Sequence, residues 1–371
     1  MKTINLTVYP YLASLQLLKK FFKKIDKNRV YSNFGSLYNL CEIKVKKFLK
    51  LKKKDIIFTS SGFSSLLACL LYIKNKNKKK KYCIVPAFSF SASAHSIILS
   101  GLDPFFVDIS KETLHPDVDI LKKIPHYIIK NAACIMLVSP FGYLLSNDKI
   151  NNISNKFKIP IIYDAADSFL NFKSVDNLNK NVFIACSFHP TKTLPANESG
   201  LIICDKTFKQ EIRSLVNFGI MNSDRNIRQV SINGKFSEYD AAIFLANFRL
   251  INNIKKYVKK ISLIYRNNFT TINSFKLFNN SLRDYISNKT FVISKNIFYA
   301  NKLKKFFLHK KIFLYLPWGK RLICYEKPFK FYKRASLSVS ENIIKTYFFL
   351  PNYYGISQKK ILKICKILGS I

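Results

Sequence analysis

Three short polar segments of the chain each follow an apolar run of the kind that forms a buried strand. The first, residues 59–65, is rich in serine, contains one glycine and opens a helical pattern. The second is Asp164-Ala-Ala-Asp167, and the third, residues 187–193, contains Lys192. Because ligands of an open parallel sheet gather at the carboxyl ends of its strands, these segments are the first candidates for a functional site.

Each segment has a chemical and a structural interpretation. Backbone amides at a helix N-terminus bind anions, and Gly62 with Ser64 would let a phosphate come close, but a serine there can also be a simple helix cap. Asp164 can point into a crevice or cap a turn, and Lys192 can be a nucleophile or one of many surface lysines. An anion site, a carboxylate and a lysine that follow three different strands in this order favour one shared functional site.

The strands that would position these segments are supplied by seven short apolar runs rich in β-branched residues. Each run is followed by a turn and then by a helical or polar stretch. This alternation predicts an α/β fold with a mostly parallel sheet flanked by helices on both faces. The runs are residues 55–59, 82–85, 104–108, 134–138, 159–164, 182–186 and 201–205.

The helical pattern predicts two parts of unequal size. Apolar residues recur at helical spacing over residues 62–73 and 91–100, and a long helix over 237–269 would begin with Ser237 as its N-cap. That helix would lead into a smaller C-terminal α+β domain that ends in a helix over 358–368. We therefore expect a large domain over residues 1–250 and a smaller one over 251–371.

The chain is strongly basic. Its 371 residues include 62 Lys and Arg against 21 Asp and Glu, a formal charge of +41, which raises nucleic acid or an anionic membrane surface as partners. The lysines are scattered along the chain, however, and Lys, Asn, Ile, Phe and Tyr are all frequent, as expected of an AT-rich genome. No GxxxxGK or GxGxxG loop occurs. We expect no nucleic-acid partner, and nucleotide hydrolysis and Rossmann hydride transfer lose support.

The cysteines and the apolar runs indicate the cellular compartment in which the protein is expected. The eight cysteines show no CxxC pair and no histidine at metal-ligand spacing, which indicates buried, reduced thiols and no metal site. No uncharged apolar run reaches the roughly 18 residues of a membrane helix, so no membrane insertion is expected. Pro10 interrupts the apolar N-terminal stretch, and no small-residue cleavage site follows. The expected location is the cytoplasm.

Seven segments in a fixed order carry a resemblance to a known family. Residues 187–192 read Ser-Phe-His-Pro-Thr-Lys and match the family motif SFHPTK letter for letter. The chain resembles the DegT/DnrJ/EryC1/StrS sugar aminotransferases, which depend on pyridoxal 5'-phosphate (PLP) and have the fold type I architecture. The other segments are residues 31–35 (NxG), 58–66 (SGTxAL), 85–94 (PxxTFxATA), 101–108 (GAxPxFVD), 164–167 (DAAQ or DAAH) and 232–242 (xNYRMSExxAA).

The resemblance implies roles for the candidate residues. Lys192 would form a Schiff base with PLP and carry a proton between substrate and cofactor, with His189 in support. Asp164 would keep the pyridine nitrogen protonated. Beside the ring, Phe90 would stack and Asp167 would face the phenolic oxygen. The phosphate would be bound by Gly62, Phe63, Ser64 and Ser187, and by Asn233 of the second subunit.

The resemblance also implies a reaction and an assembly. A homodimer with shared active sites would convert a nucleotide-linked 3-keto or 4-keto hexose into an amino sugar, with glutamate as the amino donor. The last hundred residues, which match the family least well, would help to shape the substrate pocket.

Several positions depart from the family pattern. Phe63 stands in place of Thr, Gly234-Lys235-Phe236 in place of Tyr-Arg-Met, and residues 197–200 in place of GEGG. Asp167 replaces Gln or His, and a carboxylate against a phenolate is unfavourable unless one of them is protonated. Two alternatives stay open: another PLP reaction such as sugar dehydration, and a paralogue of low activity. Relatives that dehydrate sugars have His at the lysine position, so Lys192 favours transamination.

Overall fold

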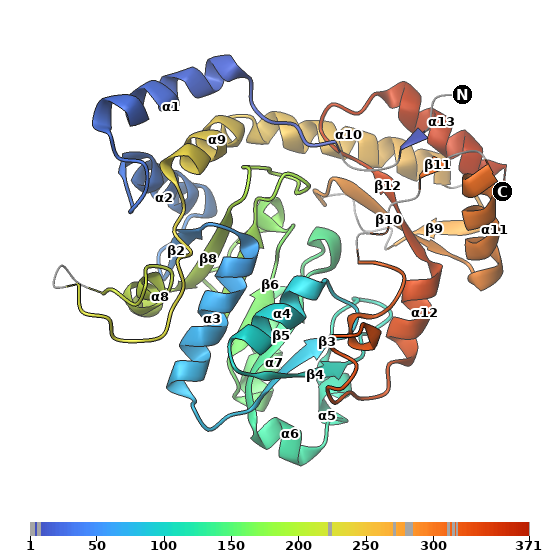
Figure 1. Cartoon of the computed structure of the whole chain (residues 1–371). Helices are drawn as coiled ribbons and strands as arrows, with labels where there is room; N and C mark the ends of the chain where they lie inside the picture. The colour runs from blue at the N-terminus through green and yellow to red at the C-terminus, as the bar shows by residue number, and fades with distance from the viewer. Residues whose placement is uncertain are drawn as a thin grey trace.

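The centre of the fold is a seven-stranded sheet with the order β2-β8-β7-β6-β5-β3-β4 (Figure 1). The computed structural model describes residues 4–5, 9–221, 225–269, 272–278, 285–309, 312–313, 316 and 318–370. β8 runs antiparallel to β2 and β7, and the other neighbouring strands are parallel. The strands are β2 (Lys54–Thr59), β3 (Tyr82–Pro86), β4 (Asp103–Val107), β5 (Ala132–Val138), β6 (Ile161–Asp164), β7 (Val182–Ser187) and β8 (Gly200–Asp205). The predicted α/β sheet is confirmed, and all seven apolar runs lie in it.

The strands are apolar along their length because the sheet is buried on both faces. Ile56 and Phe58 of β2 point into one hydrophobic core, and Ile57 between them points into the other. The helices that border the first core are α1 (Leu15–Asn28), α2 (Ser36–Leu49), α5 (Val118–Lys122), α6 (His126–Lys130), α7 (Asn147–Phe157), α9 (Glu238–Phe248) and the first turns of α10 (Ile251–Phe269). Those on the second are α3 (Gly62–Lys76), α4 (Ser91–Leu99), α8 (Lys209–Leu215) and α12 (Ser338–Thr346).

The long helix expected over residues 237–269 is in fact two helices, α9 and α10 (Ile251–Phe269). Ser237 is the N-cap of α9, as predicted, and its hydroxyl accepts a hydrogen bond from the amide of Asp240 at 3.0 Å. The prediction of one helix was wrong because neither Gly nor Pro marks the break at residues 249–250. The burial of the side chains changes at this break. Most residues of α9 are buried, whereas α10 buries only the side chains along one of its faces.

The C-terminal part contains a small antiparallel sheet of order β12-β10-β9. Its core is shared with α10, α11 (Ile297–His309) and α13 (Gln358–Gly369), which lie beside it in Figure 1. The strands are β9 (Phe275–Leu277), β10 (Lys289–Ser294) and β12 (Tyr347–Pro351), while β1 (Ile4–Asn5) pairs in parallel with β11 (Ile312–Phe313). The predicted smaller α+β portion is therefore present.

The C-terminal part also completes the core of the large sheet. Phe106 of β4 donates its amide to the carbonyl of Lys333 at 3.0 Å and accepts the amide of Ala335 at 2.9 Å. The Asp108 carboxylate accepts the amides of Val339 and Ser340, and so caps α12. The division into residues 1–250 and 251–371 stays a prediction, since the later residues build part of both cores.

Two expectations about composition can be compared with the structure. All eight cysteines are buried with free thiols, as the sequence predicted. Among the described helices, none is both long enough and apolar enough to cross a bilayer.

Candidate active site

The first predicted segment forms the N-terminus of α3. Ser61 is the N-cap, and its hydroxyl accepts the amide of Ser64 at 3.0 Å. The same geometry leaves the amides of Gly62 and Phe63 without partners inside the helix. The Ser64 hydroxyl is within 2.9 Å of the Ser60 hydroxyl. Backbone amides and hydroxyls thus meet where a helix dipole favours an anion.

Close packing brings the third predicted segment to the same place. A Cβ atom built on Gly62 would lie 2.6 Å from Cβ of Ser187, the last residue of β7. A Cβ atom on Gly200, at the start of β8, would lie 2.4 Å from the carbonyl oxygen of Ser61. The two glycines let the ends of three strands approach one another, so Ser187 lies beside the α3 N-terminus as the sequence suggested.

Asp164 ends β6 and is nearly buried, with 5% of its surface exposed. Its Oδ2 atom accepts a hydrogen bond from the Ser93 hydroxyl at 2.8 Å. Burial raises the pKa of Asp164, although the Ser93 hydrogen bond and the charge of Lys192 oppose this shift. Among the described residues, no cation forms an ion pair with this carboxylate. Asp164 is thus a buried carboxylate whose charge lacks a direct partner.

Phe90 is the N-cap residue of α4 and lies in the short connection that follows β3. Its ring is half exposed, at 50% of the residue surface. Ser93, which binds Asp164, follows one helical turn later, so the two residues lie on the same side of α4. An exposed aromatic ring therefore lies on the helix whose first turn binds the buried carboxylate.

Lys192 follows β7 in a loop, and its amide donates to the carbonyl of His189 at 2.8 Å. The positive charge of Lys192 opposes the burial that raises the pKa of Asp164, and it contributes, after Lys289, to the lowered pKa of Asp167. The amide of Thr193, the residue after Lys192, donates to Oδ1 of Asp167 at 2.9 Å, so the loop of Lys192 lies beside this aspartate. The structure brings together the lysine and the two aspartates that the sequence singled out.

His189 is directed to the loop surface. Its Nδ1 atom lies 2.8 Å from the Thr191 hydroxyl, and its Nε2 atom lies 3.2 Å from a carboxylate oxygen of Glu198. The side chains of His189 and Glu198 are 42% and 59% exposed. Burial lowers the pKa of His189, against the opposing charge of Glu198. Its contacts order the loop that carries Lys192, and its catalytic role stays a prediction.

Asp167 is paired with a lysine that the sequence did not indicate. Its Oδ2 atom lies 2.9 Å from Nζ of Lys289, the first residue of β10, and each side chain is 6% exposed. Its Oδ1 atom accepts the amide and the hydroxyl of Thr193 at 2.9 and 3.0 Å. The chain therefore neutralises this carboxylate with a buried ammonium rather than with a proton.

Asn233 lies beside the α3 N-terminus of its own chain but presents an exposed side chain. Its neighbour Gly234 accepts the amide of Ser60 at 2.8 Å, and Lys235 forms a β-bridge with Thr59. The Asn233 amide oxygen accepts a hydrogen bond from Nζ of Lys235 at 2.7 Å. Its contribution to the site of a second subunit stays a prediction.

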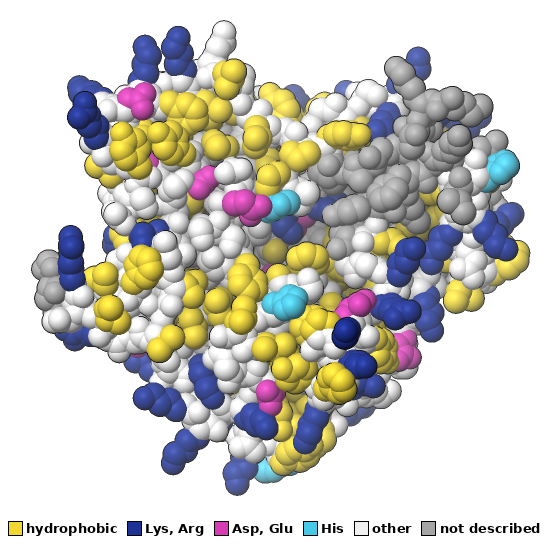
Figure 2. Space-filling model, in the orientation of Figure 1, with side chains coloured by type: hydrophobic (Ala, Val, Ile, Leu, Met, Phe, Trp, Pro, Cys, Tyr) yellow, Lys and Arg dark blue, Asp and Glu magenta, His cyan; other side chains and the backbone are white. Residues whose placement is uncertain are grey.

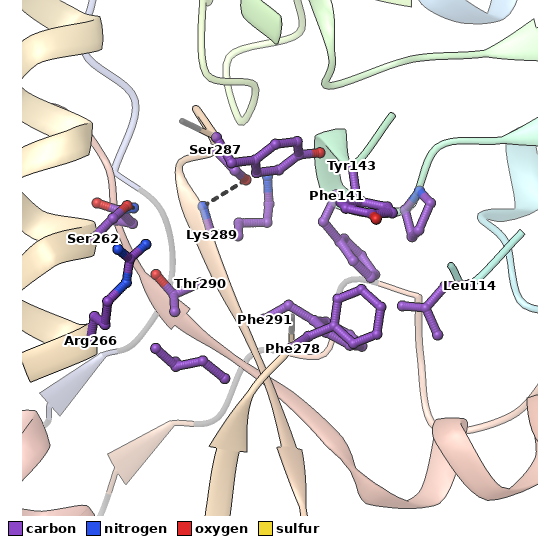
Figure 3. Close-up of a pocket in the computed structure, with 14 residues that line it drawn as sticks. Leu114, Phe141, Tyr143, Ser262, Arg266, Phe278, Ser287, Lys289, Thr290 and Phe291 are labelled. Atoms are coloured by element: carbon purple, nitrogen blue, oxygen red, sulfur yellow. Dashed lines mark hydrogen bonds between the residues drawn. The ribbon is translucent and has the colours of Figure 1, made fainter. Parts of the chain in front are cut away.

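A small cavity of about 50 Å³ lies next to the Lys289–Asp167 pair. Figure 3 shows it between α10, which carries Ser262 and Arg266, and the segment that carries Phe141 and Tyr143. Tyr285 and Asn352 also line it, and among the described residues the buried Tyr285 hydroxyl and the Oδ1 atom of Asn352 have no hydrogen-bond partner. The cavity shows that the C-terminal part contributes both aromatic and polar side chains next to the site.

The basic side chains do not converge on one patch of the face shown in Figure 2, where they occur in several separate groups. No group of three or more His, Cys, Asp or Glu side chains in the described part of the chain could hold a metal ion.

The model of the DegT/DnrJ/EryC1/StrS aminotransferase family matches residues 16–369. The chain belongs to this family of PLP-dependent aminotransferases. The chain is similar, at 26% identity over 99% of its length and 98% of the relative, to an Escherichia coli protein described as dTDP-4-amino-4,6-dideoxy-D-glucose transaminase. A Shigella dysenteriae protein of the same description is 28% identical over 69% of this chain and 68% of its own.

A solved structure agrees on the fold. A candidate PLP-dependent aminotransferase from Bacillus cereus superposes with a TM-score of 0.90, covers 99% of this chain and 100% of its own, and is 22% identical. The likeness of fold thus extends through the C-terminal part, where the sequence motifs were weakest.

The site contains residues that sequence reasoning missed. Ser93 lies within the segment that resembles PxxTFxATA, at the position of the family's last Thr, and that correspondence could have identified it. Lys289 and Asn288 had no such signal, because they lie in the poorly matched C-terminal part of this DegT/DnrJ/EryC1/StrS member.

Proposed function

We propose that this chain holds PLP on Lys192 and transfers an amino group from glutamate to a keto sugar linked to a nucleotide. The observation that carries the proposal is the buried Asp164 carboxylate, which has no ion-pair partner among the described residues and lies near Lys192. A buried anion of this kind suits a pyridinium nitrogen.

The remaining residues fit the same cofactor. The amides of Gly62 and Phe63, with the hydroxyls of Ser64 and Ser187, would hold its phosphate at the α3 N-terminus. Phe63 has no hydroxyl to offer the phosphate. The phosphate site would still have the two backbone amides and the hydroxyls of Ser64 and Ser187. Phe90 would cover one side of the ring, and PLP would supply the electron sink for amino transfer.

The lysine would have two tasks. Its amine would attach the cofactor, and once released it would carry a proton between the substrate carbon and the cofactor. His189 would support this task by ordering the loop between β7 and β8 through Thr191 and Glu198.

The sugar substrate and the assembly belong to the proposal as well. The two curated relatives are described as transaminases of a dTDP-linked amino sugar, which supports a nucleotide-linked sugar as the substrate class. The exposed Asn233 beside the phosphate site supports a homodimer in which each subunit donates this side chain to the other.

The test is the absorbance spectrum of the purified protein with PLP, before and after addition of glutamate. We expect a visible band from PLP attached to Lys192, its conversion by glutamate to the pyridoxamine form, and its absence in Lys192→Ala. Lys173→Ala, on a surface loop, serves as the control lysine and should keep the band.

The outcomes separate the alternatives. A band that glutamate leaves unchanged would favour a different amino donor, another PLP reaction or a paralogue of low activity. No band in the parent protein would contradict PLP binding itself.

A further inference from the structure

The Lys289 ammonium of the buried Asp167–Lys289 pair uses all of its hydrogen-bonding capacity. Besides Asp167, Nζ of Lys289 donates to Oδ1 of Asn288 at 2.8 Å and to the carbonyl of Thr191 at 3.1 Å. The carboxylate accepts from Lys289 and twice from Thr193. An ammonium has three protons, and all three are occupied.

Neither charge would be stable here alone. Removing one partner of a buried ion pair leaves the other charge in the protein interior without a counter-charge. This strongly lowers the free energy of unfolding. Burial would raise the pKa of Asp167, but the charges of Lys289 and Lys192 outweigh burial and lower it. Burial, in turn, lowers the pKa of Lys289, against the charge of Asp167. Lys289 thus helps, together with Lys192 and the Thr193 amide, to keep the carboxylate ionised.

The two partners come from distant parts of the chain. Asp167 follows β6 of the large sheet, and Lys289 begins β10 of the small sheet, 122 residues later. Asp167 is also the position at which the chain departs from the Gln or His of its family. The departure from the family pattern at Asp167 is thus accompanied by an ion-pair partner, Lys289, from the C-terminal part.

We propose that Lys289 is a positioning residue that makes Asp167 and itself one neutral unit, which takes the place of the family's neutral Gln or His beside the phenolic oxygen of PLP. This inference rests on the proposed PLP site. Lys289 holds the carboxylate against Thr193 and cancels its charge near Lys192. Asp167 then presents no uncompensated charge to the cofactor.

The proposal predicts opposite effects of the two charges on the nitrogen that joins PLP to Lys192. That nitrogen is cationic when protonated, so an uncompensated Asp167 raises its pKa and an uncompensated Lys289 lowers it. The other ionisable groups that face the pair are Lys192, His189 and Tyr285, and they are the same in every variant.

The experiment is a pH titration of the visible PLP band in the parent protein and three variants. We expect Lys289→Met to raise the midpoint by about one pH unit and Asp167→Asn to lower it by about one unit. The double variant Asp167→Asn/Lys289→Met should return close to the parent. Shifts in the same direction, or no shift, would overturn the proposal.

A matched control uses a second lysine ion pair remote from the site. Lys209 lies 3.0 Å from Glu42 and 3.2 Å from Asp55, and its side chain is 18% exposed. Lys209→Met should leave the titration midpoint unchanged. A shift in this variant equal to that of Lys289→Met would show that general loss of positive charge causes the effect, and would overturn the proposal.

A measurement on the protein without PLP separates this inference from the proposed function. Urea unfolding should show a lower midpoint in each single variant and partial recovery in the double variant, because the pair is lost as a unit. If the double variant recovers its urea midpoint but the parent protein shows no visible PLP band, the ion pair is purely structural. That result would overturn both proposals. If the parent protein shows a normal PLP band but Lys289→Met and Asp167→Asn do not shift its pH midpoint in opposite directions, only the role of Lys289 is overturned.

Discussion

The Ser93 hydroxyl lies 2.8 Å from Oδ2 of Asp164 and joins the first turn of α4 to the end of β6. Seventy-one residues separate the two in the sequence. Burial raises the pKa of this carboxylate, and the hydroxyl partly reverses the effect. Ser93 therefore helps to keep Asp164 ionised, which is the state that a pyridinium partner requires.

Replacing Ser93 should change the pH dependence of the reaction. Ser93→Ala removes a donor to the carboxylate, so the pKa of Asp164 rises and the ionised form is lost at a higher pH. We expect the acidic limb of the pH profile, measured for conversion of the PLP band by glutamate, to move upward by about one unit. Ser93→Thr keeps the hydroxyl and should preserve the parent profile. An unchanged profile in Ser93→Ala would contradict this role.

Substitution of Gly62 should weaken both the site and the fold. In Gly62→Ala the added methyl would lie 2.6 Å from Cβ of Ser187, so the strand end or the helix must shift. We expect a loss of about 1–3 kcal/mol in the free energy of unfolding and weaker PLP binding, measured by urea unfolding and by titration with PLP.

Gly369 is the matched control for that substitution. A Cβ atom there would meet no other atom within 4 Å, so Gly369→Ala should leave the unfolding midpoint and PLP binding nearly unchanged. Equal effects of the two substitutions would show that the contact with Ser187 is not the cause.

His115 should make the fold sensitive to mild acid. Its ring is buried, with Nε2 3.2 Å from the Tyr163 hydroxyl, and burial lowers its pKa to about 4. The unfolded chain therefore binds a proton between about pH 6.5 and pH 4 that the folded chain excludes, so stability falls as the pH falls through this range.

The expected size of this effect is about 2 kcal/mol lost between pH 7 and pH 5. It can be measured by urea unfolding of the parent and of His115→Gln at both pH values. The amide of Gln keeps a donor and an acceptor but does not titrate, so the variant should lose less stability on acidification. Parallel losses in the two proteins would assign the acid sensitivity to other groups.

The sequence by itself determined the large sheet and the core of the site. Each strand of that sheet is a continuous apolar run, because both of its faces are buried, and such a pattern is visible in a few neighbouring residues. The segments that end the strands carried Asp164, Ser187 and Lys192, and parallel strands place their carboxyl ends at one edge. The proximity of these residues thus followed from local patterns and one rule of topology.

Only the tertiary structure decided which partners these residues have. The pairing of Asp167 with Lys289 and the contact of Ser93 with Asp164 each join segments far apart in the chain. The break between α9 and α10 likewise has no local signal. Such contacts arise from the way whole layers pack, and a buried charge reveals its compensation only when the folded chain brings the opposite charge to it.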